Sequence, residues 1–285
     1  MDDKVKTAVV TGASSGMGRD IAIRLAGKGF RVIAAARRKE RLEELAAQNQ
    51  GIVPRQVDLS DVEDREKFCR YLSDQEEPVS VLVNNAGYSI RGAVEDVPIK
   101  DAQRLFEVNV FALIRVTQAC LPGMRALRGG TIVNLSSMAG KFAFPMSGVY
   151  AATKHAVEAI SDALRIEVLP FGIRVIAIRP GFIATEFNDV ANEMTGDLLA
   201  RTDPEYKPLY QASGAGIGKL FVNAVVPGPE LIGEIVLEAI LSDNPKTAYF
   251  GGFMSGEFME KRTSLDDDAF DRYLSEITGL ADLKV

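Results

Sequence analysis

The sequence predicts a single α/β domain in which a parallel sheet is covered by helices on both faces. Short, apolar, β-branched segments alternate with longer segments of helical spacing over most of the 285 residues. The segment 79–83 (VSVLV) is apolar at almost every position, which is typical of a strand buried on both faces. Strands that alternate with helices are joined by right-handed crossovers, so these strands should run parallel.

The first elements set an alternation that the rest of the chain follows. Residues 6–11 (KTAVVT) form an apolar run that stops at glycines, and the helix expected at 16–28 carries Ile21, Ile23 and Leu25 at helical spacing. A second strand at 31–36 (RVIAAA) precedes a charged amphipathic helix at 38–48. By the same criteria the later strands lie at 52–57, 79–83, 130–135, 173–179 and 247–250, and the later helices lie at 61–73, 101–126, 148–169 and 229–241.

Two segments depart from this alternation. Residues 186–228 contain no clear strand, and a stretch of that length inside a compact domain is usually functional or poorly ordered. We expect them to form a helical lid over the substrate. The extension from about 253 to 285 is acidic and weakly helical, and it should either pack on the domain or contact another subunit.

The charge and the hydropathy pattern exclude two classes of partner. A net charge of −6 leaves no basic excess to neutralise the phosphates of a nucleic acid. A membrane span needs roughly 18 consecutive apolar residues without charges, and we find no such stretch and no signal peptide. The expectation is a soluble, cytoplasmic protein.

The few cysteines and the one histidine argue against a metal site. Cys69 and Cys120 lie far apart and outside any metal-binding cluster, so two reduced thiols are favoured over one disulfide. His155 is expected on the solvated side of a helix. The segment Gly214–Lys219 has the glycines of a phosphate loop but follows no strand, so we assign it to the lid.

The segment after the first strand predicts a dinucleotide site. The strand ends at Thr11 and runs into GASSGMG, whose glycines allow a tight turn and close approach of the backbone to a pyrophosphate. The helix that follows offers unpaired N–H groups and a positive dipole end. The residues expected to bind here are Gly12, Ser14, Ser15, Gly16, Met17 and Gly18.

The end of the second strand favours NADP(H) over NAD(H). An acidic residue at this position would bind the ribose 2′-hydroxyl of NAD, whereas an arginine pairs with the 2′-phosphate of NADP. The strand ends in three alanines and is followed by Arg37 and Arg38. The alternative is that both arginines merely begin a solvated helix.

A tyrosine and a lysine in the helix 148–169 predict acid–base chemistry. Tyr150 and Lys154 are four residues apart, so both project from one face of the helix. A free tyrosine has a pKa of about 10, and a nearby ammonium stabilises its phenolate. Ser137 follows the strand 130–135, and strand ends and helix starts converge on one edge of such a sheet.

These motifs occur in the order found in the short-chain dehydrogenase/reductase family, which the chain resembles from about residue 5 to 252. The resemblance implies a Rossmann-type doubly wound fold and an NADP(H)-dependent oxidoreductase that interconverts a secondary alcohol and a ketone. It implies that Ser137 binds the substrate oxygen, Tyr150 exchanges the proton, and Lys154 also holds the nicotinamide ribose. Asn109 matches the residue that holds a water in a proton relay, although a helix asparagine bonded to a local carbonyl is the alternative.

The same resemblance assigns the remaining cofactor contacts. Asp58 and Leu59 would lie at the adenine, and Asn85, Ala86 and Gly87 would lie at the adenosine ribose. The loop after the sixth strand would hold the nicotinamide carboxamide and the pyrophosphate through Pro180, Gly181, Ile183 and Thr185.

The substrate is expected to be a hydrophobic alcohol or ketone of steroid, retinoid or aromatic type, because apolar residues surround the site. Phe144 and Phe187 are the principal candidates to line it, and the wider set is Tyr88, Ile90, Phe142, Met146, Met194, Leu198, Leu199, Tyr206, Leu209, Tyr210, Leu220 and Phe221. The alternative is that these residues pack the lid onto the core. The segment 163–172 (ALRIEVLPFG) resembles the hydroxysteroid and retinol dehydrogenase branch.

Two other functions remain open at this point. One is a 3-oxoacyl-thioester reductase, and the other is a non-catalytic NADP-binding sensor, which would not need the tyrosine. Relatives often associate through the helices near 101–126 and 148–169, so we expect a homodimer or homotetramer.

Overall fold

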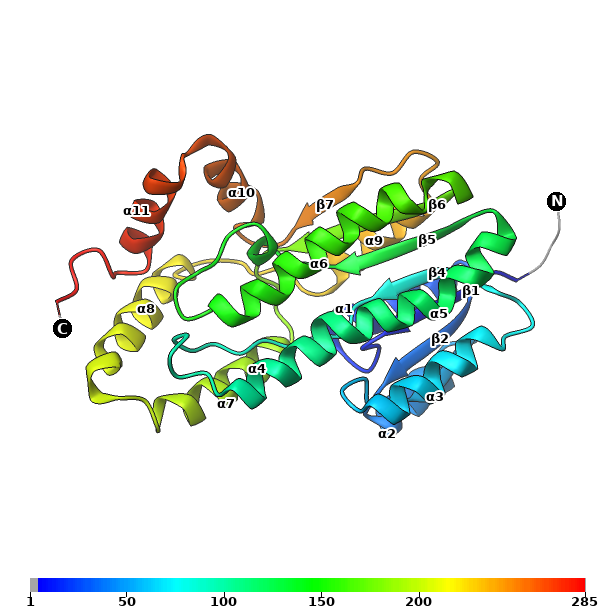
Figure 1. Cartoon of the computed structure of the whole chain (residues 1–285), viewed down its shortest axis with the longest axis horizontal. Helices are drawn as coiled ribbons and strands as arrows, with labels where there is room; N and C mark the ends of the chain where they lie inside the picture. The colour runs from blue at the N-terminus through cyan, green and yellow to red at the C-terminus, as the bar shows by residue number, and fades with distance from the viewer. Residues whose placement is uncertain (1–4, 285) are drawn as a thin grey trace.

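The structure, a computed structural model, describes residues 5–284, apart from the side chains of Val190 and Met194. Seven parallel strands form one sheet in the order β3-β2-β1-β4-β5-β6-β7 (Figure 1). The strands are β1 (Thr7–Thr11), β2 (Arg31–Ala36), β3 (Ile52–Gln56), β4 (Val79–Asn84), β5 (Gly130–Leu135), β6 (Ile173–Pro180) and β7 (Ala248–Gly251). The order reverses between β1 and β4, and ligands of such sheets bind at the carboxyl ends of the strands beside that reversal. The predicted fold class is confirmed.

Helices cover both faces of the sheet. The α-helices of residues 5–284 are α1 (Gly16–Gly27), α2 (Lys39–Gln48), α3 (Val62–Ser73), α4 (Ile99–Phe106), α5 (Ala112–Leu127), α6 (Gly148–Glu167), α7 (Phe187–Leu199), α8 (Lys207–Leu220), α9 (Glu230–Leu241), α10 (Ser255–Ser264) and α11 (Asp267–Ile277). In β1, Val10 packs in a cluster with residues of α1, α2 and α9, whereas Val9 packs in a cluster with residues of α3, α5 and α6. Cys69 and Cys120 are free, buried thiols of the second cluster, as predicted.

The longest helical stretch is interrupted by a π-turn. Helix α4 continues through η1 (Glu107–Phe111), a single π-helical turn, into α5. By length and hydropathy the 29 residues from Ile99 to Leu127 could cross a membrane, but half of their most apolar window is buried in the fold. Composition alone therefore does not exclude a membrane span here, contrary to the expectation from sequence. The fold nevertheless buries half of the most apolar window of this stretch.

The segment 186–228 is mainly helical, as expected. It forms α7, the 3₁₀ turn η4 (Pro204–Tyr206) and α8 at one end of the molecule (Figure 1). The Tyr210 hydroxyl donates to Asp96 (2.7 Å) and accepts from the Ala93 amide (2.9 Å), so α8 is tied to the loop after β4. Gly214–Lys219 lies inside α8 and is therefore no phosphate loop.

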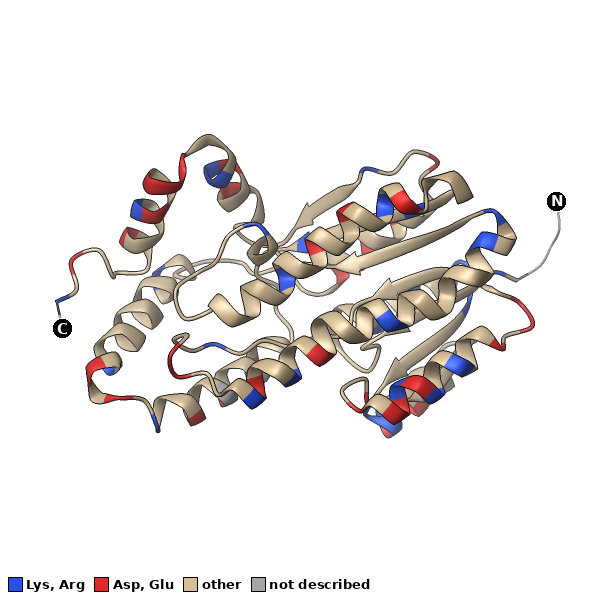
Figure 2. Cartoon of the chain, in the orientation of Figure 1, with Lys and Arg blue, Asp and Glu red and all other residues tan. Residues whose placement is uncertain are grey.

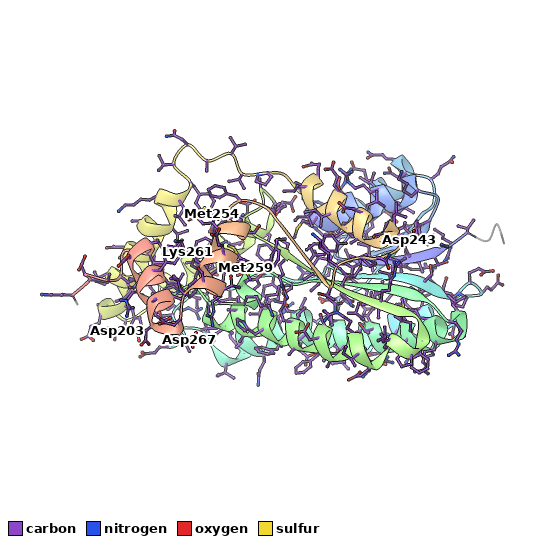
Figure 3. The ribbon with its side chains drawn as sticks, turned by 90° about the horizontal axis from the view of Figure 1, so that it is seen from above. Asp203, Asp243, Met254, Met259, Lys261 and Asp267 are labelled. Carbon is purple, nitrogen blue, oxygen red and sulfur yellow. The ribbon has the colours of Figure 1, made fainter. Side chains whose placement is uncertain are left out.

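The C-terminal extension forms two helices that pack on the domain, which confirms one of the two expectations for it. Phe258, Phe270 and Leu274 are buried in one cluster with Met138 and Phe142. Figure 3 shows Met254, Met259 and Lys261 of this extension at the end of the molecule opposite Asp243. The helices α10 and α11 thus cover the segment that follows Ser137.

Candidate active site

The glycine-rich loop between β1 and α1 has no room for side chains. A Cβ on Gly18 would lie 2.4 Å from the Gly12 carbonyl oxygen, and Gly12 has a φ of +68°. Asn85 holds this loop, because its side-chain Nδ2 donates to the Thr11 carbonyl (2.9 Å). The Thr11 hydroxyl in turn accepts the amides of Asn85 and Ala86 (both 3.0 Å). The loop and the NAG segment after β4 are therefore fixed together beside the reversal in strand order.

The N-terminus of α1 is open to an anion. Its N-cap residue, Ser15, makes no side-chain capping hydrogen bond, so the first-turn amides keep their capacity to donate. Thr185 lies opposite, since a Cβ on Gly16 would be 3.3 Å from its Cγ2. Met17 is the second residue of this helix. This cradle, closed by Gly12 and Gly18, fits a dinucleotide pyrophosphate.

Arg38 lies directly beside the glycine-rich loop. Its guanidinium donates to the hydroxyls of Ser14 (3.2 Å) and Ser15 (2.5 Å). It also forms an ion pair with Glu186 (2.8 Å), which pairs with Arg41 as well (2.7 Å). The sequence argument found Arg38 but missed Arg41 and Glu186, which it had no means to bring together. Two arginines and two hydroxyls thus surround one small polar site at the end of β2.

Arg37 takes no part in that cluster and acts instead on Asp58. Burial by itself raises the pKa of Asp58, but hydrogen bonds from the Ser60 hydroxyl and amide and the charge of Arg37 hold it below its ordinary value. Leu59 is buried and lines a small cavity with Ala86 and Val108. The ionised Asp58 and the apolar Leu59 suit the adenine position expected for them.

The four expected catalytic side chains come together beyond the carboxyl ends of β4 and β5. Ser137 lies close enough to Tyr150 for a side-chain hydrogen bond that lowers the pKa of the phenol. The Lys154 ammonium lies 5.9 Å from the centroid of the Tyr150 ring and donates to the Leu135 carbonyl (2.7 Å). A Cβ on Gly87 would be 3.1 Å from Asn109 Oδ1 and 3.8 Å from Lys154 Nζ, so these two side chains flank the same backbone.

Burial controls the acidity of the tyrosine and the lysine. Burial raises the pKa of Tyr150 to about 12, against the Ser137 hydrogen bond and the charge of Arg91, which lower it. Burial also lowers the pKa of Lys154 to about 8, against the carboxylate of Glu158. The lowered pKa of Tyr150 that the sequence predicts is therefore not found in the protein by itself. At neutral pH the phenol is protonated, as a proton donor to a ketone requires.

Asn109 lies in the π-turn, and its side chain forms hydrogen bonds to the segment after β4 and to α6. Its Nδ2 donates to the Tyr88 carbonyl and the Thr153 hydroxyl (both 3.0 Å), and its Oδ1 accepts the Tyr88 amide (3.1 Å). The alternative of an asparagine bonded to a local carbonyl is wrong, because the partners of this side chain belong to other segments of the chain. Its bonds fix the segment after the NAG sequence next to α6.

The loop after β6 is anchored from two sides. The Gly181 amide donates to the Gly251 carbonyl (2.7 Å), and a Cβ on Gly181 would lie 2.4 Å from the Phe253 carbonyl oxygen. Pro180 and Ile183 are buried, and the Ile183 carbonyl accepts from Asn188 (3.2 Å). These contacts hold the loop that leads to Thr185 and the glycine-rich cradle.

The two aromatic residues expected at the substrate lie in different places. Phe187 meets the Tyr150 ring edge-on, with the two ring centroids 6.0 Å apart. Phe144 packs instead against Phe142 (5.1 Å) and Phe258 (5.0 Å) under the C-terminal extension. The burial of Tyr210 and of others in the wider set, Leu198 and Ile90, agrees with the alternative that they pack the lid onto the core. The side chain of Met194 lies outside the described residues.

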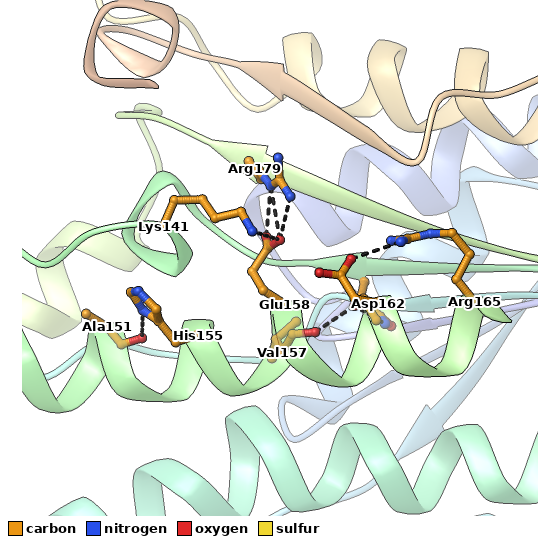
Figure 4. A network of polar contacts seen from close by, with 10 residues as sticks. Lys141, Ala151, His155, Val157, Glu158, Asp162, Arg165 and Arg179 are labelled. Carbon is orange, nitrogen blue, oxygen red and sulfur yellow. Dashed lines mark hydrogen bonds and ion pairs between the residues drawn. The ribbon is translucent and has the colours of Figure 1, made fainter. Parts of the chain in front are cut away.

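A buried carboxylate one helical turn after Lys154 was not foreseen from sequence. Glu158 accepts from Arg179 through both of its oxygens (2.6–3.1 Å) and lies 3.4 Å from the Lys141 ammonium (Figure 4). It thereby joins α6 to the end of β6 and to the turn after Ser137. His155, on the same helix, is exposed as expected.

Comparisons with known proteins agree with this geometry. The family model described as "short chain dehydrogenase" matches residues 6–196. The chain is 42% identical over 186 residues to "Uncharacterized oxidoreductase YusZ" of Bacillus subtilis, covering 63% of this chain and 66% of that one, just under two thirds. It is 34% identical to "Retinol dehydrogenase 8" of Homo sapiens, covering 84% and 79% of the two chains. A solved structure titled "The Closed form of serine dehydrogenase complexed with NADP+" superposes with a TM-score of 0.73 at 27% identity, covering 86% and 94%.

Proposed function

Because this chain belongs to the short-chain dehydrogenase/reductase family, we propose that it is an NADP(H)-dependent oxidoreductase that interconverts a secondary alcohol and a ketone. Tyr150 is the proton donor and acceptor of this reaction. The observation that carries the proposal is the convergence of three side chains: Ser137 lies close enough to Tyr150 to lower its pKa, and the Lys154 ammonium lies 5.9 Å from the centroid of the same ring.

The reduction follows from what each side chain offers. The substrate carbonyl oxygen lies between the Ser137 and Tyr150 hydroxyls and accepts a hydrogen bond from each. The nicotinamide supplies the hydride to the carbonyl carbon when it is bound. Tyr150 then gives its proton to the oxygen, and the positive charge of Arg91 stabilises the phenolate left behind. The Lys154 ammonium, 5.9 Å from the ring centroid, is the second positive charge near it. Alcohol oxidation runs through the same contacts in reverse.

NADP(H) is proposed as the cofactor because the polar site at the end of β2 is built from positive charge. Arg38, with Arg41 next to it, offers donors that fit a 2′-phosphate, and Ser14 and Ser15 add two hydroxyls. The residue at the end of β2 is Ala36, so the strand end itself offers no carboxylate to a ribose 2′-hydroxyl, and the nearby carboxylate of Glu186 is paired with Arg38 and Arg41. A solved relative that carries NADP+ supports the same choice.

The substrate is proposed to have a hydrophobic body. Phe187 and Leu198 lie in one cluster with Tyr150, and an apolar wall favours an apolar ligand. The likeness to retinol dehydrogenase 8 supports a substrate of retinoid, steroid or aromatic-ketone type.

The test is Tyr150→Phe, assayed by NADPH oxidation with a panel of steroid, aromatic and aliphatic ketones and one 3-oxoacyl thioester. Loss of the proton donor should lower turnover by roughly 10²- to 10⁴-fold, while NADPH affinity measured by fluorescence titration stays unchanged. Tyr71→Phe, which removes another buried phenol hydroxyl, is the control and should keep its activity. Full activity of Tyr150→Phe would refute the proposal, and activity with the thioester alone would point to an acyl reductase.

A further inference from the structure

A single arginine with a fixed position lies in the wall of the proposed catalytic site. Arg91 belongs to the loop between β4 and α4, and its carbonyl accepts from the Thr195 hydroxyl of α7 (3.0 Å). The next amide, of Gly92, donates to the Met146 carbonyl (2.7 Å). A Cβ on Gly92 would be 2.6 Å from Leu198 Cδ1, so this part of the loop is wedged against the lid. The backbone therefore has little freedom to carry Arg91 elsewhere.

The guanidinium of Arg91 is held by neutral partners. It donates to the side-chain oxygens of Asn188 (2.6 Å) and Asn192 (3.1 Å), both on α7. Asn188 also donates to the Ile183 carbonyl, in the loop expected to hold the nicotinamide. Among residues 5–284 no carboxylate pairs with Arg91, and burial lowers the pKa of the guanidinium.

The positive charge of Arg91 acts on the phenol of Tyr150. The charge of Arg91 is one of the two influences that lower the pKa of Tyr150, and the charge of a Tyr150 phenolate in turn opposes the lowering of the pKa of Arg91 by burial. Arg91 is thus linked to the phenol by its field and to the Ile183 carbonyl through Asn188. Its guanidinium is therefore near enough to the phenol to act on its pKa and is joined, through Asn188, to the loop expected to hold the nicotinamide.

A half-buried arginine stays charged at every pH in the working range, and burial without an anion costs free energy. Two asparagine oxygens satisfy some of its five N–H donors, and none of them neutralises its charge. A planar guanidinium held at two points matches a carboxylate, which it can bind through two parallel hydrogen bonds. An apolar alcohol or ketone alone would leave this group uncompensated.

We propose that Arg91 is a specificity-determining residue that binds a carboxylate on the substrate, so that the preferred substrates are oxo acids and hydroxy acids with an apolar body. The inference rests on the proposed function and narrows its substrate class. The carboxylate binds at Arg91, the carbonyl lies between Ser137 and Tyr150, and the apolar body packs against Phe187.

The experiment compares acids with their own esters. The wild-type protein and Arg91→Gln are assayed with 4-oxo-4-phenylbutanoate, 5-oxo-5-phenylpentanoate and the methyl ester of each. In the wild type at least one acid should exceed its ester in kcat/KM. In Arg91→Gln that ratio should fall by about 10- to 100-fold, the loss expected for hydrogen bonds to a charged group. Arg91→Lys should fall in between, because it keeps the charge without the planar fork.

Two controls separate this role from the alternatives. Arg201→Gln removes an exposed positive charge from the end of α7 and should leave the ratio unchanged. NADPH affinity should be the same in Arg91→Gln and wild type, and binding of the acid to the NADPH complex, followed by nicotinamide fluorescence, should weaken.

Three results would overturn the inference: no preference for either acid in the wild type, an equal loss for acid and ester in Arg91→Gln, or weaker NADPH binding in that variant. Each of them leaves the proposed function standing if neutral ketones are reduced. Failure to reduce any ketone would count against both.

Discussion

Tyr150 and Lys154 lie in surroundings that disfavour their charged forms. Lys154 is 6% exposed and Tyr150 is 9% exposed, and burial shifts both toward their neutral forms. The carboxylate of Glu158 opposes this effect at Lys154, and Arg91 opposes it at Tyr150. Such a site is a less stable arrangement than an apolar one, and proteins commonly accept that cost where activity requires it.

Lys154→Met should therefore raise the stability of the protein at pH 7. The folded-state pKa of Lys154, about 8, lies below the unfolded value of 10.5. Between these values the unfolded state binds more protons, so the wild type gains stability as pH rises from 8 to 10.5. Thermal unfolding at pH 7 and pH 10 should show a larger advantage of the variant at pH 7. Lys28→Met, at an exposed position, is the control, and a constant difference at both values would contradict the argument.

At the scale of elements, local patterns located nearly all of the sheet and its covering helices. The glycines after Thr11 and the Tyr150–Lys154 spacing were enough to place the glycine-rich loop and the helix α6, because both motifs are local. The π-turn at 107–111 left no signal, since its residues (EVNVF) continue the apolar pattern of a helix. The ion pair of Glu186 and Arg41 was missed because the two residues are far apart in sequence and come together only in the folded chain. The helical pattern of 253–285 was too weak to predict two separate helices, α10 and α11.

Phe258→Ala should show how much the extension contributes to the domain. The ring is fully buried and lies 5.4 Å from Phe142 and 5.0 Å from Phe144. Removing it should lower the free energy of unfolding by about 3–5 kcal/mol, measured by urea denaturation. Leu241→Ala, at a half-exposed position, should change it by less than about 1 kcal/mol. Equal effects of the two would mean that α10 adds little to the core.

At the scale of the whole molecule, charge is distributed unevenly over the helices. Figure 2 shows charged residues dense along α2 and α3 and sparse along α5 and α8. Phe111 at the start of α5 and Ile166 near the end of α6 are 48% and 68% exposed. Glu186, by contrast, is a charged residue that forms ion pairs with two arginines distant in the sequence, Arg38 and Arg41.

Glu186→Gln should strengthen NADPH binding. Its carboxylate pairs with Arg38 and Arg41, the same groups that are proposed to hold the 2′-phosphate, so the two anions compete. Exposed pairs contribute little, and we expect the NADPH dissociation constant to fall by about 2- to 5-fold at low salt. This gain in NADPH affinity should be smaller in 0.5 M salt, where the screening length is about 4 Å. The affinity for NADH, which has no 2′-phosphate, should not change. Glu193→Gln on the same helix is the control, and weaker NADPH binding would show that Glu186 instead orients the arginines.

Ile166→Asp should produce a monomer. We expect a homodimer or homotetramer through α5 and α6, and a carboxylate on the apolar part of that face would have to be desolvated on association. Sedimentation velocity should show the wild type as an oligomer and the variant at one chain. Val62→Asp, on the exposed side of α3, should leave the assembly intact. A monomeric wild type would disprove the assignment of this face.

The position of α10 and α11 has a consequence for biosynthesis. Phe142 leaves the ribosome 116 residues ahead of Phe258, the ring that covers it. At about 5–20 residues per second, that delay is roughly 6 to 23 s. During this interval the sheet can pair through β6 while the aromatic surface next to Ser137 faces water. Just before α10 and α11 emerge, the nascent chain should therefore be most prone to aggregate and should bind a chaperone most readily.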